Sequence, residues 1–301
     1  MTTLIKPYEW PTWLAILGCY GVFVGALVGY AAAPSLVWCL PMALCAGLHS
    51  SLQHECIHGH PTRYQWFNTA LIFWPLIPWT CYLEYRRSHL AHHVTDELTH
   101  PKTDPESYFF TAEDWAALSR PMRWLYRINS CLIGRLVLGP WLGAWAGVRQ
   151  LLERPTGEIM ANLSLQLIGL VGLGLGLIAA GMSLWVYLFC VAWPGAALIS
   201  LRSYYEHRPA QSNEESTAIV ETNVVLSFLF LHNNLHIVHH TLPGVPWYAI
   251  PRVYREKKAH WQRLNGAYWF SGYHEIGRRY GLSVKDELIH HSQRQSKEIR
   301  S

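Results

Sequence analysis

Residues 10–54 read WPTWLAILGCYGVFVGALVGYAAAPSLVWCLPMALCAGLHSSLQH, a stretch without a single Asp, Glu, Lys or Arg. Residues 159–201 form a second run that also lacks these four residue types. A helix of about 20 apolar residues spans the hydrocarbon of a bilayer, and each run is about twice that length. We therefore predict two hairpins of transmembrane helices, at about 13–55 and 160–203, with uncharged turns at 31–35 and 181–183.

The charges indicate how these hairpins are oriented. All 24 basic and 20 acidic residues lie outside the two charge-free runs. Lys and Arg then occupy the side of the membrane that holds both termini and the middle segment, and the positive-inside rule assigns that side to the cytoplasm. We expect a multi-pass protein of a bacterial inner membrane with cytoplasmic termini. We interpret the net charge of +4 as favouring contact with anionic lipid headgroups, and we predict no binding of nucleic acid.

The predicted fold class is therefore all-α integral membrane, with four transmembrane helices and a cytosolic helical cap. We expect a single domain over 1–301, in which 56–159 and 204–280 form the cap and 281–301 form a polar, solvated tail. Residues 67–83 are apolar but short and interrupted by Pro75 and Pro78, which favours an interfacial segment over a span. Residues 112–157 resemble amphipathic helices on the interface, of which 136–148 are apolar enough to dip inward. The seven cysteines form no C-x-x-C pair, and we predict no disulfide framework.

Three histidine tracts lie at the edges of these segments: His54-Glu55-Cys56-Ile57-His58, His89-Leu90-Ala91-His92-His93 and His236-Ile237-Val238-His239-His240. In a helix, positions i, i+3 and i+4 share one face. His207 leaves the second hairpin as His54 leaves the first, so both hairpins deliver histidines to one side of the membrane. We expect all three tracts to converge there.

Neutral imidazole is the commonest metal ligand in proteins. The predicted ligands are His54, His58, His89, His92, His93, His207, His236, His239 and His240. A tetrahedral zinc ion uses at most four ligands, so this number implies two metals. Two iron ions fit the set best, and we expect them to use O2 to oxidise an unactivated C–H bond. No catalytic residue beyond the metal site is predicted.

Four residues beside the tracts are predicted to support the ligands. Glu55 and Glu206 are placed to orient imidazoles through their second ring nitrogen. His232 lies one helical turn before His236 and is a candidate for a direct or supporting role. Asn233 is a candidate for holding a metal-bound water. Other carboxylates are weaker candidates, because Glu84 can pair with Arg87 and Asp96 can cap a helix.

Together, the tracts resemble the histidine boxes of the integral-membrane fatty acid desaturase and hydroxylase superfamily. The resemblance implies a four-helix membrane stem, a cytosolic cap holding a diiron centre, and O2 used with electrons from a separate ferredoxin, rubredoxin or cytochrome. Residues 234–240 resemble the acyl-lipid desaturase form of the third box. Tyr205-Glu206-His207-Arg208 resembles the element that supplies a further ligand in membrane alkane hydroxylases, and His207 is carried over on that basis.

The preferred interpretation is a desaturase that introduces a C=C bond into a long alkyl chain of a lipid or fatty acyl substrate. The same scaffold serves hydroxylases, ketolases and terminal-alkene-forming fatty acid decarboxylases, which stay open as alternatives. A metal transporter is disfavoured, because it would need polar groups within the spans. We expect aromatic residues to line a tunnel for the alkyl chain: Trp74, Trp79, Phe109 and Phe110. We expect the substrate headgroup to lie near an arginine, either Arg86, Arg87 or Arg123.

Overall fold

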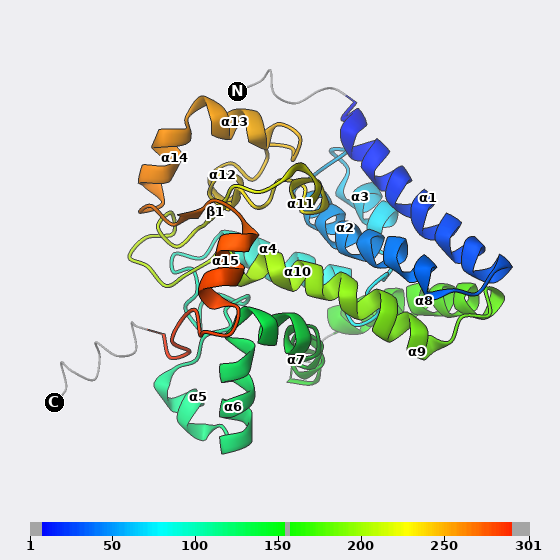
Figure 1. Ribbon diagram of the computed structural model, residues 1–301, viewed down its shortest axis with the longest axis horizontal. Helices are drawn as coiled ribbons and strands as arrows, with labels where there is room; N and C mark the ends of the chain where they lie inside the picture. The colour runs from blue at the N-terminus through cyan, green and yellow to red at the C-terminus, as the bar shows by residue number, and fades with distance from the viewer. Residues whose placement is uncertain (1–7, 154–156, 291–301) are drawn as a thin grey trace.

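The computed structural model describes residues 8–153 and 157–290. Over these residues the chain is helical apart from loops and one parallel pair of two-residue strands, β1 (Ile219–Val220) and β2 (Trp269–Phe270) (Figure 1). The all-α prediction is confirmed with this small exception. The last residues of the predicted tail, with Arg294, Lys297 and Arg300, lie outside the described residues, as do residues 1–7.

Four stretches among the described residues are long and apolar enough to cross a membrane, at 10–32, 36–57, 162–179 and 184–206. They consist of these elements: α1 (Trp10–Ala32); η1 (Leu36–Trp38) followed by α2 (Cys39–Ile57); α8 (Gly157–Ala179); and α9 (Leu184–Tyr187), the π-helical η2 (Leu188–Ala192) and α10 (Trp193–Glu206) in one run. The four predicted spans are thus present, with turns at the two predicted positions.

The segment between the two hairpins contains a further pair of apolar helices. The region from 67 to 83 contains only the end of α3 (Gln65–Ile72) and the start of α4 (Tyr82–His93), so no helix there is long enough to span. In contrast, α6 (Arg120–Asn129) and α7 (Leu132–Glu153) meet at 120° and together pass the length and composition test for a bent span. Part of the region predicted to be interfacial is therefore apolar enough to enter the membrane.

A close contact between α2 and α10 sets the positions of the two helix ends that carry histidines. A Cβ placed on Gly195 of α10 would lie 2.7 Å from the Ala46 Cβ and 3.1 Å from the Ala43 carbonyl oxygen of α2. Only glycine permits backbones to approach so closely. The helices run side by side in Figure 1, and the first ends beside His58 and the second beside His207.

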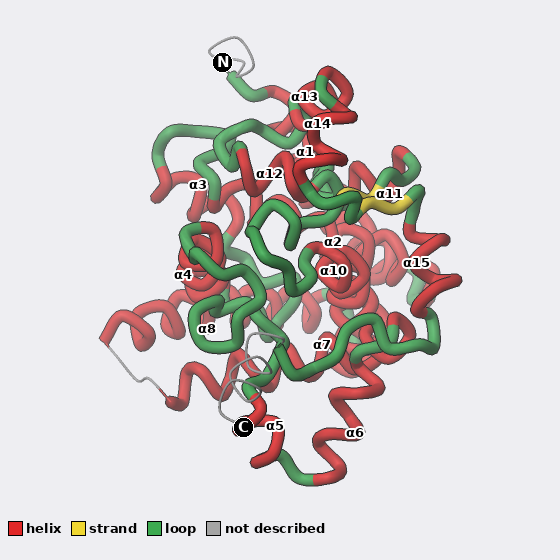
Figure 2. The backbone as a smooth tube through the Cα atoms, turned by 90° about the vertical axis from the view of Figure 1, so that its left-hand side faces the viewer, coloured by secondary structure: helices red, strands yellow, loops and turns green. Residues whose placement is uncertain are grey.

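The cap is built from short helices and loops at this end of the bundle. Its remaining elements are α5 (Ala112–Ala117), α11 (Val224–Leu229), α12 (His236–Thr241), α13 (Ile250–Glu256), α14 (Lys258–Leu264) and α15 (Tyr273–Tyr280). Figure 2 shows α10 nearly end-on with long loops in front of it. The histidine tracts therefore lie where the apolar bundle meets a loop-rich region.

The predicted solvated tail is wrong for part of residues 285–290, whereas Leu282 and Val284 are exposed. The Lys285 side chain is 4% exposed, and Leu288 and His290 are buried. Irregular backbone carries this segment across the surface, where its polar groups bond to α7 and to the loop before α5. The polar composition of this segment led to the prediction that it is exposed to solvent. Sequence alone does not show which buried carbonyls and carboxylates bind a lysine.

Candidate metal centre

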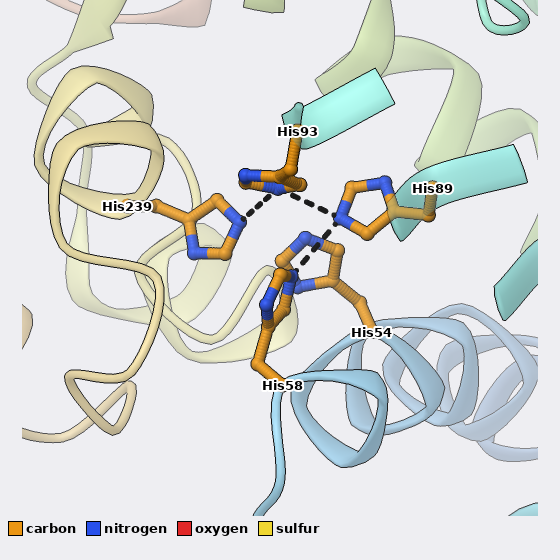
Figure 3. Close-up of side chains that lie close together, drawn as sticks. All are labelled: His54, His58, His89, His93 and His239. Carbon is orange, nitrogen blue, oxygen red and sulfur yellow. Dashed lines mark hydrogen bonds between the residues drawn. The ribbon is translucent and has the colours of Figure 1, made fainter. Parts of the chain in front are cut away.

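Five of the predicted histidines form one cluster (Figure 3), with His54 and His58 from the end of α2, His89 and His93 from α4, and His239 from α12. The five side chains point toward a common centre. The Nε2 atom of His89 lies 3.1 Å from that of His58 and 3.1 Å from that of His93. The Nε2 atom of His239 lies 3.0 Å from that of His93. Three segments far apart in sequence therefore present ring nitrogens to one small volume.

The other four histidines form a second cluster directly beside the first. His92, His207 and His240 place ring nitrogens within 4.8 Å of one another, and the Nε2 atom of His207 lies 3.1 Å from that of His236. The His240 ring stacks on that of His93 with centroids 4.2 Å apart. The structure thus brings together all nine histidines predicted from the sequence, in one group of five and one of four.

Both clusters fit a transition metal. Metal–imidazole bonds are about 2.0–2.1 Å long, so two ligands at a right angle place their nitrogens about 3 Å apart, as the Nε2 pairs in both clusters do. The buried Nε2 atoms of His54 and His240 have no hydrogen-bond partner in the structure. Buried polar atoms are rarely left without a partner, and a metal ion would supply one at each cluster.

Electrostatics keep most of these rings neutral, the form that binds a metal. Burial and the neighbouring imidazoles lower the pKa of His58 to about 2 and that of His93 to about 2. Burial also holds the pKa of His207, His239 and His240 well below the ordinary value. Ligand nitrogens must be deprotonated to bind a metal. The clusters are therefore ready for a cation at neutral pH.

Two carboxylates that sequence analysis missed hold the second ring nitrogen of ligand candidates. The Asp104 Oδ1 atom lies 2.8 Å from the His92 Nδ1 atom, and the Glu106 Oε2 atom lies 3.2 Å from the His89 Nδ1 atom. Burial works to lower the pKa of His92, but the bond to Asp104 and the charge of Glu106 outweigh it and raise that pKa. Such carboxylates orient metal-binding imidazoles. The sequence signal was two acidic residues in a proline-punctuated loop after the second tract.

Two of the four predicted supporting residues lie beside a ligand candidate. The Asn233 Oδ1 atom lies 3.0 Å from the His236 Nδ1 atom, and Asn233 donates from its Nδ2 atom to the Glu206 Oε1 atom at 2.9 Å. Glu206 also pairs with Arg202 at 2.8 Å. Glu206 therefore reaches the His236 ring mainly through Asn233, which itself contacts a ring nitrogen.

The contacts described for the other two supporting candidates include none of the nine histidines. The Glu55 Oε1 atom accepts a bond from the backbone N–H of Trp247 at 3.0 Å and belongs to a separate buried group with Glu9 and His60. His232 is not on the helix of the third tract, because the chain turns at residues 230–235 and His232 adopts a positive φ of 56°. Its ring stacks on Trp247, with centroids 5.8 Å apart.

A cavity of about 460 Å³ extends from the histidines into the space between α4, α7 and α10. Its metal-facing end is lined by His89, His92, His207 and His236. Small and apolar residues of α7 and α10 line another part: Gly139, Pro140, Gly143, Ala146, Ala196 and Ile199. Polar and charged residues, among them Glu84, Glu106 and Arg202, complete the lining. The volume lies in the range of small-molecule sites.

The predicted tunnel residues are largely replaced by others. Trp79 lines this cavity, whereas Trp74, Phe109 and Phe110 are not among its lining residues. The predicted headgroup arginines, Arg86, Arg87 and Arg123, are also absent from the lining, and Arg135 and Arg202 take their place. Spacing along the chain did not reveal that α7 forms one wall.

Comparison with known proteins gives one family. The model of the fatty acid desaturase family matches residues 34–272, a range that includes all nine histidines. The chain belongs to the fatty acid desaturase family. Family membership implies an oxidoreductase that is typically iron-dependent. A search among curated proteins finds no match to the chain.

Replacing Asp104 should weaken metal binding in this desaturase-family chain. In Asp104→Ala, His92 loses the carboxylate that orients its ring, and loss of such a partner costs about 10- to 100-fold in metal affinity. Iron retention under a graded chelator challenge measures the effect. Asp96→Ala removes an exposed carboxylate and serves as the control. Equal retention in both variants would contradict the assigned role of Asp104.

The lowered histidine pKa values predict that acid destabilises the metal-free protein. The unfolded chain binds protons to His58 and His93 below about pH 6.5, whereas the folded chain does so only near about pH 2. Stability is therefore lost as pH falls through this window. We expect the unfolding temperature to drop between about pH 7 and pH 5, and to drop less in His93→Asn than in the exposed-site control His260→Asn. An identical pH profile in the two variants would contradict this account.

Proposed function

We propose that the chain is an O2-dependent diiron oxidoreductase that desaturates a long alkyl chain of a lipid or fatty acyl substrate. One observation carries the proposal: histidines of both clusters line one part of a cavity, and apolar residues of α7 and α10 line another part of it. The proposed oxidising centre therefore opens into the cavity that would bind the alkyl chain. The nine histidines are the proposed iron ligands.

Bound iron would supply the power to activate O2 and to remove hydrogen from an unactivated C–H bond. The overall reaction converts –CH2–CH2– and O2, with two electrons and two protons, into –CH=CH– and two molecules of water. Desaturation therefore needs a reductant from outside the substrate. We propose that a separate ferredoxin, rubredoxin or cytochrome delivers the electrons to the cap.

The residues of this chain position the metal ligands and the alkyl chain, and they exclude water from the cavity. Gly143 of α7 lines the cavity without a side chain, and a Cβ placed there would meet no heavy atom within 4 Å. Ile199 and Trp79 supply apolar surface that favours hydrocarbon over water. Asp104 and Asn233 fix the rings of His92 and His236. These contacts hold the ligands at the end of the alkyl slot.

The membrane setting supports the same proposal. The outward side chains of α8 are apolar and exposed, with Leu167 61%, Ile168 60% and Leu175 62% exposed, a surface that lipid would cover. We propose that the chain is one domain whose cap, with the diiron centre and both termini, faces the cytoplasm of a bacterial inner membrane. The basic residues beyond the spans support this orientation.

The product test separates desaturation from other oxidations at the same site. In a host without desaturases, wild-type protein should give a new alkenoyl chain detected by gas chromatography with mass spectrometry. His239→Ala should abolish it by removing a member of the five-histidine cluster, and the exposed-site control His260→Ala should retain it. A hydroxylated, ketone-containing or terminal-alkene product that depends on His239 would contradict desaturation. Any product that persists in His239→Ala would contradict the assigned centre.

The cavity assigns a role in chain selection to Gly143. Gly143→Leu should fill part of the slot and reduce conversion of the longest accepted chain by about tenfold or more, since one methylene group in a tight pocket changes discrimination by about 10–200-fold. Iron content should stay at the wild-type level. The matched control is Gly25→Leu on α1, where a Cβ also meets nothing within 4 Å. An unchanged product profile in Gly143→Leu would contradict a role for Gly143 in chain selection.

A further inference from the structure

Residues 281–290, here called the C-terminal segment, lie outside the range that matches the family yet pack against the metal-binding region. The segment bonds to the loop before α5 through backbone groups. The Phe110 N–H donates to the Leu288 carbonyl at 2.8 Å, and the His290 N–H donates to the Phe110 carbonyl at 3.1 Å. The Tyr108 hydroxyl donates to the Asp286 carboxylate at 3.1 Å. This is the loop that carries Asp104.

The segment also reaches the end of α10 through one side chain. The Lys285 ammonium donates to the Tyr204 carbonyl at 2.9 Å and to the His207 carbonyl at 2.8 Å. It pairs with Asp286 at 2.9 Å, and its side chain is 4% exposed. A buried ammonium is expensive unless it is paired and hydrogen-bonded, and these three partners meet that requirement. Lys285 is therefore held in a fixed place.

Helix ends explain why a lysine belongs there. The last four carbonyls of an α-helix have no partner within the helix, and the negative end of the helix dipole favours a cation. The α10 helix ends at Glu206, and its Tyr204 carbonyl is one of these groups. A lysine that bonds to such carbonyls caps the helix. Lys285 thus fixes the backbone from which the His207 side chain projects.

Both the loop before α5 and the end of α10 contact the four-histidine cluster, and the contact that Lys285 makes directly is with the end of α10. The loop carries Asp104, which holds His92, and the end of α10 carries His207. The Nε2 atoms of His92 and His207 lie 3.0 Å apart. The five-histidine cluster shares α4 and α12 with the four-histidine cluster but takes its other members from the end of α2, and none of its members receives a bond from Lys285 in the structure.

We propose that Lys285 is a positioning residue for the second metal, the one held by the four-histidine cluster of His92, His207, His236 and His240. The inference rests on the proposed diiron function. Loss of the Lys285 ammonium removes the donor to the Tyr204 and His207 carbonyls, and His207 then no longer keeps its ring against those of His92 and His236. The first metal stays bound by the other five histidines.

The test compares iron per chain in purified protein by elemental mass spectrometry. Wild type should hold two irons per chain, and Lys285→Met should hold one. Lys285→Arg keeps a positive charge and N–H donors at this position and should restore the second iron. Lys257→Met removes an exposed lysine of the same charge and should keep two. Electron paramagnetic resonance of the oxidised samples gives an independent readout, because a lone ferric ion yields a signal that a coupled ferric pair lacks.

The other possible iron contents show which of the two proposals is wrong, the diiron function or the role of Lys285. Wild-type protein that binds no iron would overturn the diiron proposal and, with it, this inference. Two irons in both wild type and Lys285→Met, with equal resistance to a chelator, would overturn the role of Lys285 alone. Loss of both irons together would contradict a role confined to the second metal.

A milder variant keeps the test decisive if Lys285→Met does not fold. Tyr108→Phe removes the hydroxyl that lies 3.3 Å from the Lys285 ammonium and bonds to Asp286. The second iron should then be lost faster to a chelator than in wild type, while the first is lost at the wild-type rate. Equal loss rates for the second iron in this variant and in wild type would overturn the inference.

Discussion

The structure depends on the packing of nine imidazoles, most of them held neutral, against one another. Ring nitrogens such as the Nε2 atoms of His54 and His240 are buried without a hydrogen-bond partner, an arrangement that costs free energy in a protein interior. A cation at each cluster would relieve that cost and bind the rings together. The protein accepts this cost because α2, α4, α10 and α12 are fixed by contacts elsewhere.

Those contacts begin in the apolar bundle. The close approach of Gly195 to Ala46 fixes α10 against α2, so the ends of the two helices lie at a common level. The cap then adds carboxylates and an amide behind the rings, with Asp104 on His92 and Asn233 on His236. The apolar lining of the cavity comes from α10 and from α7. Apolar helices thus position histidines and line part of the cavity, an arrangement that would suit the proposed reaction on hydrocarbon.

Much of this could be predicted from the sequence, because its signals are local. Charge-free runs showed the spans, and helical spacing showed which histidines share a face. The missed features depend on contacts between distant segments. Nothing local distinguishes Asp104 from an ordinary loop residue, or Lys285 from a solvated tail. Glu55 was next to a ligand candidate in sequence, but its side chain turns to the backbone of Trp247.

The most direct test of the central claim is a crystal structure of the purified protein with anomalous diffraction data at the iron absorption edge. The account predicts two iron peaks, one enclosed by His54, His58, His89, His93 and His239 and the other by His92, His207, His236 and His240. A single peak, or iron bound at the buried group of Glu9, Glu55 and His60 in place of the histidine clusters, would contradict the two-metal centre on which the proposed chemistry rests.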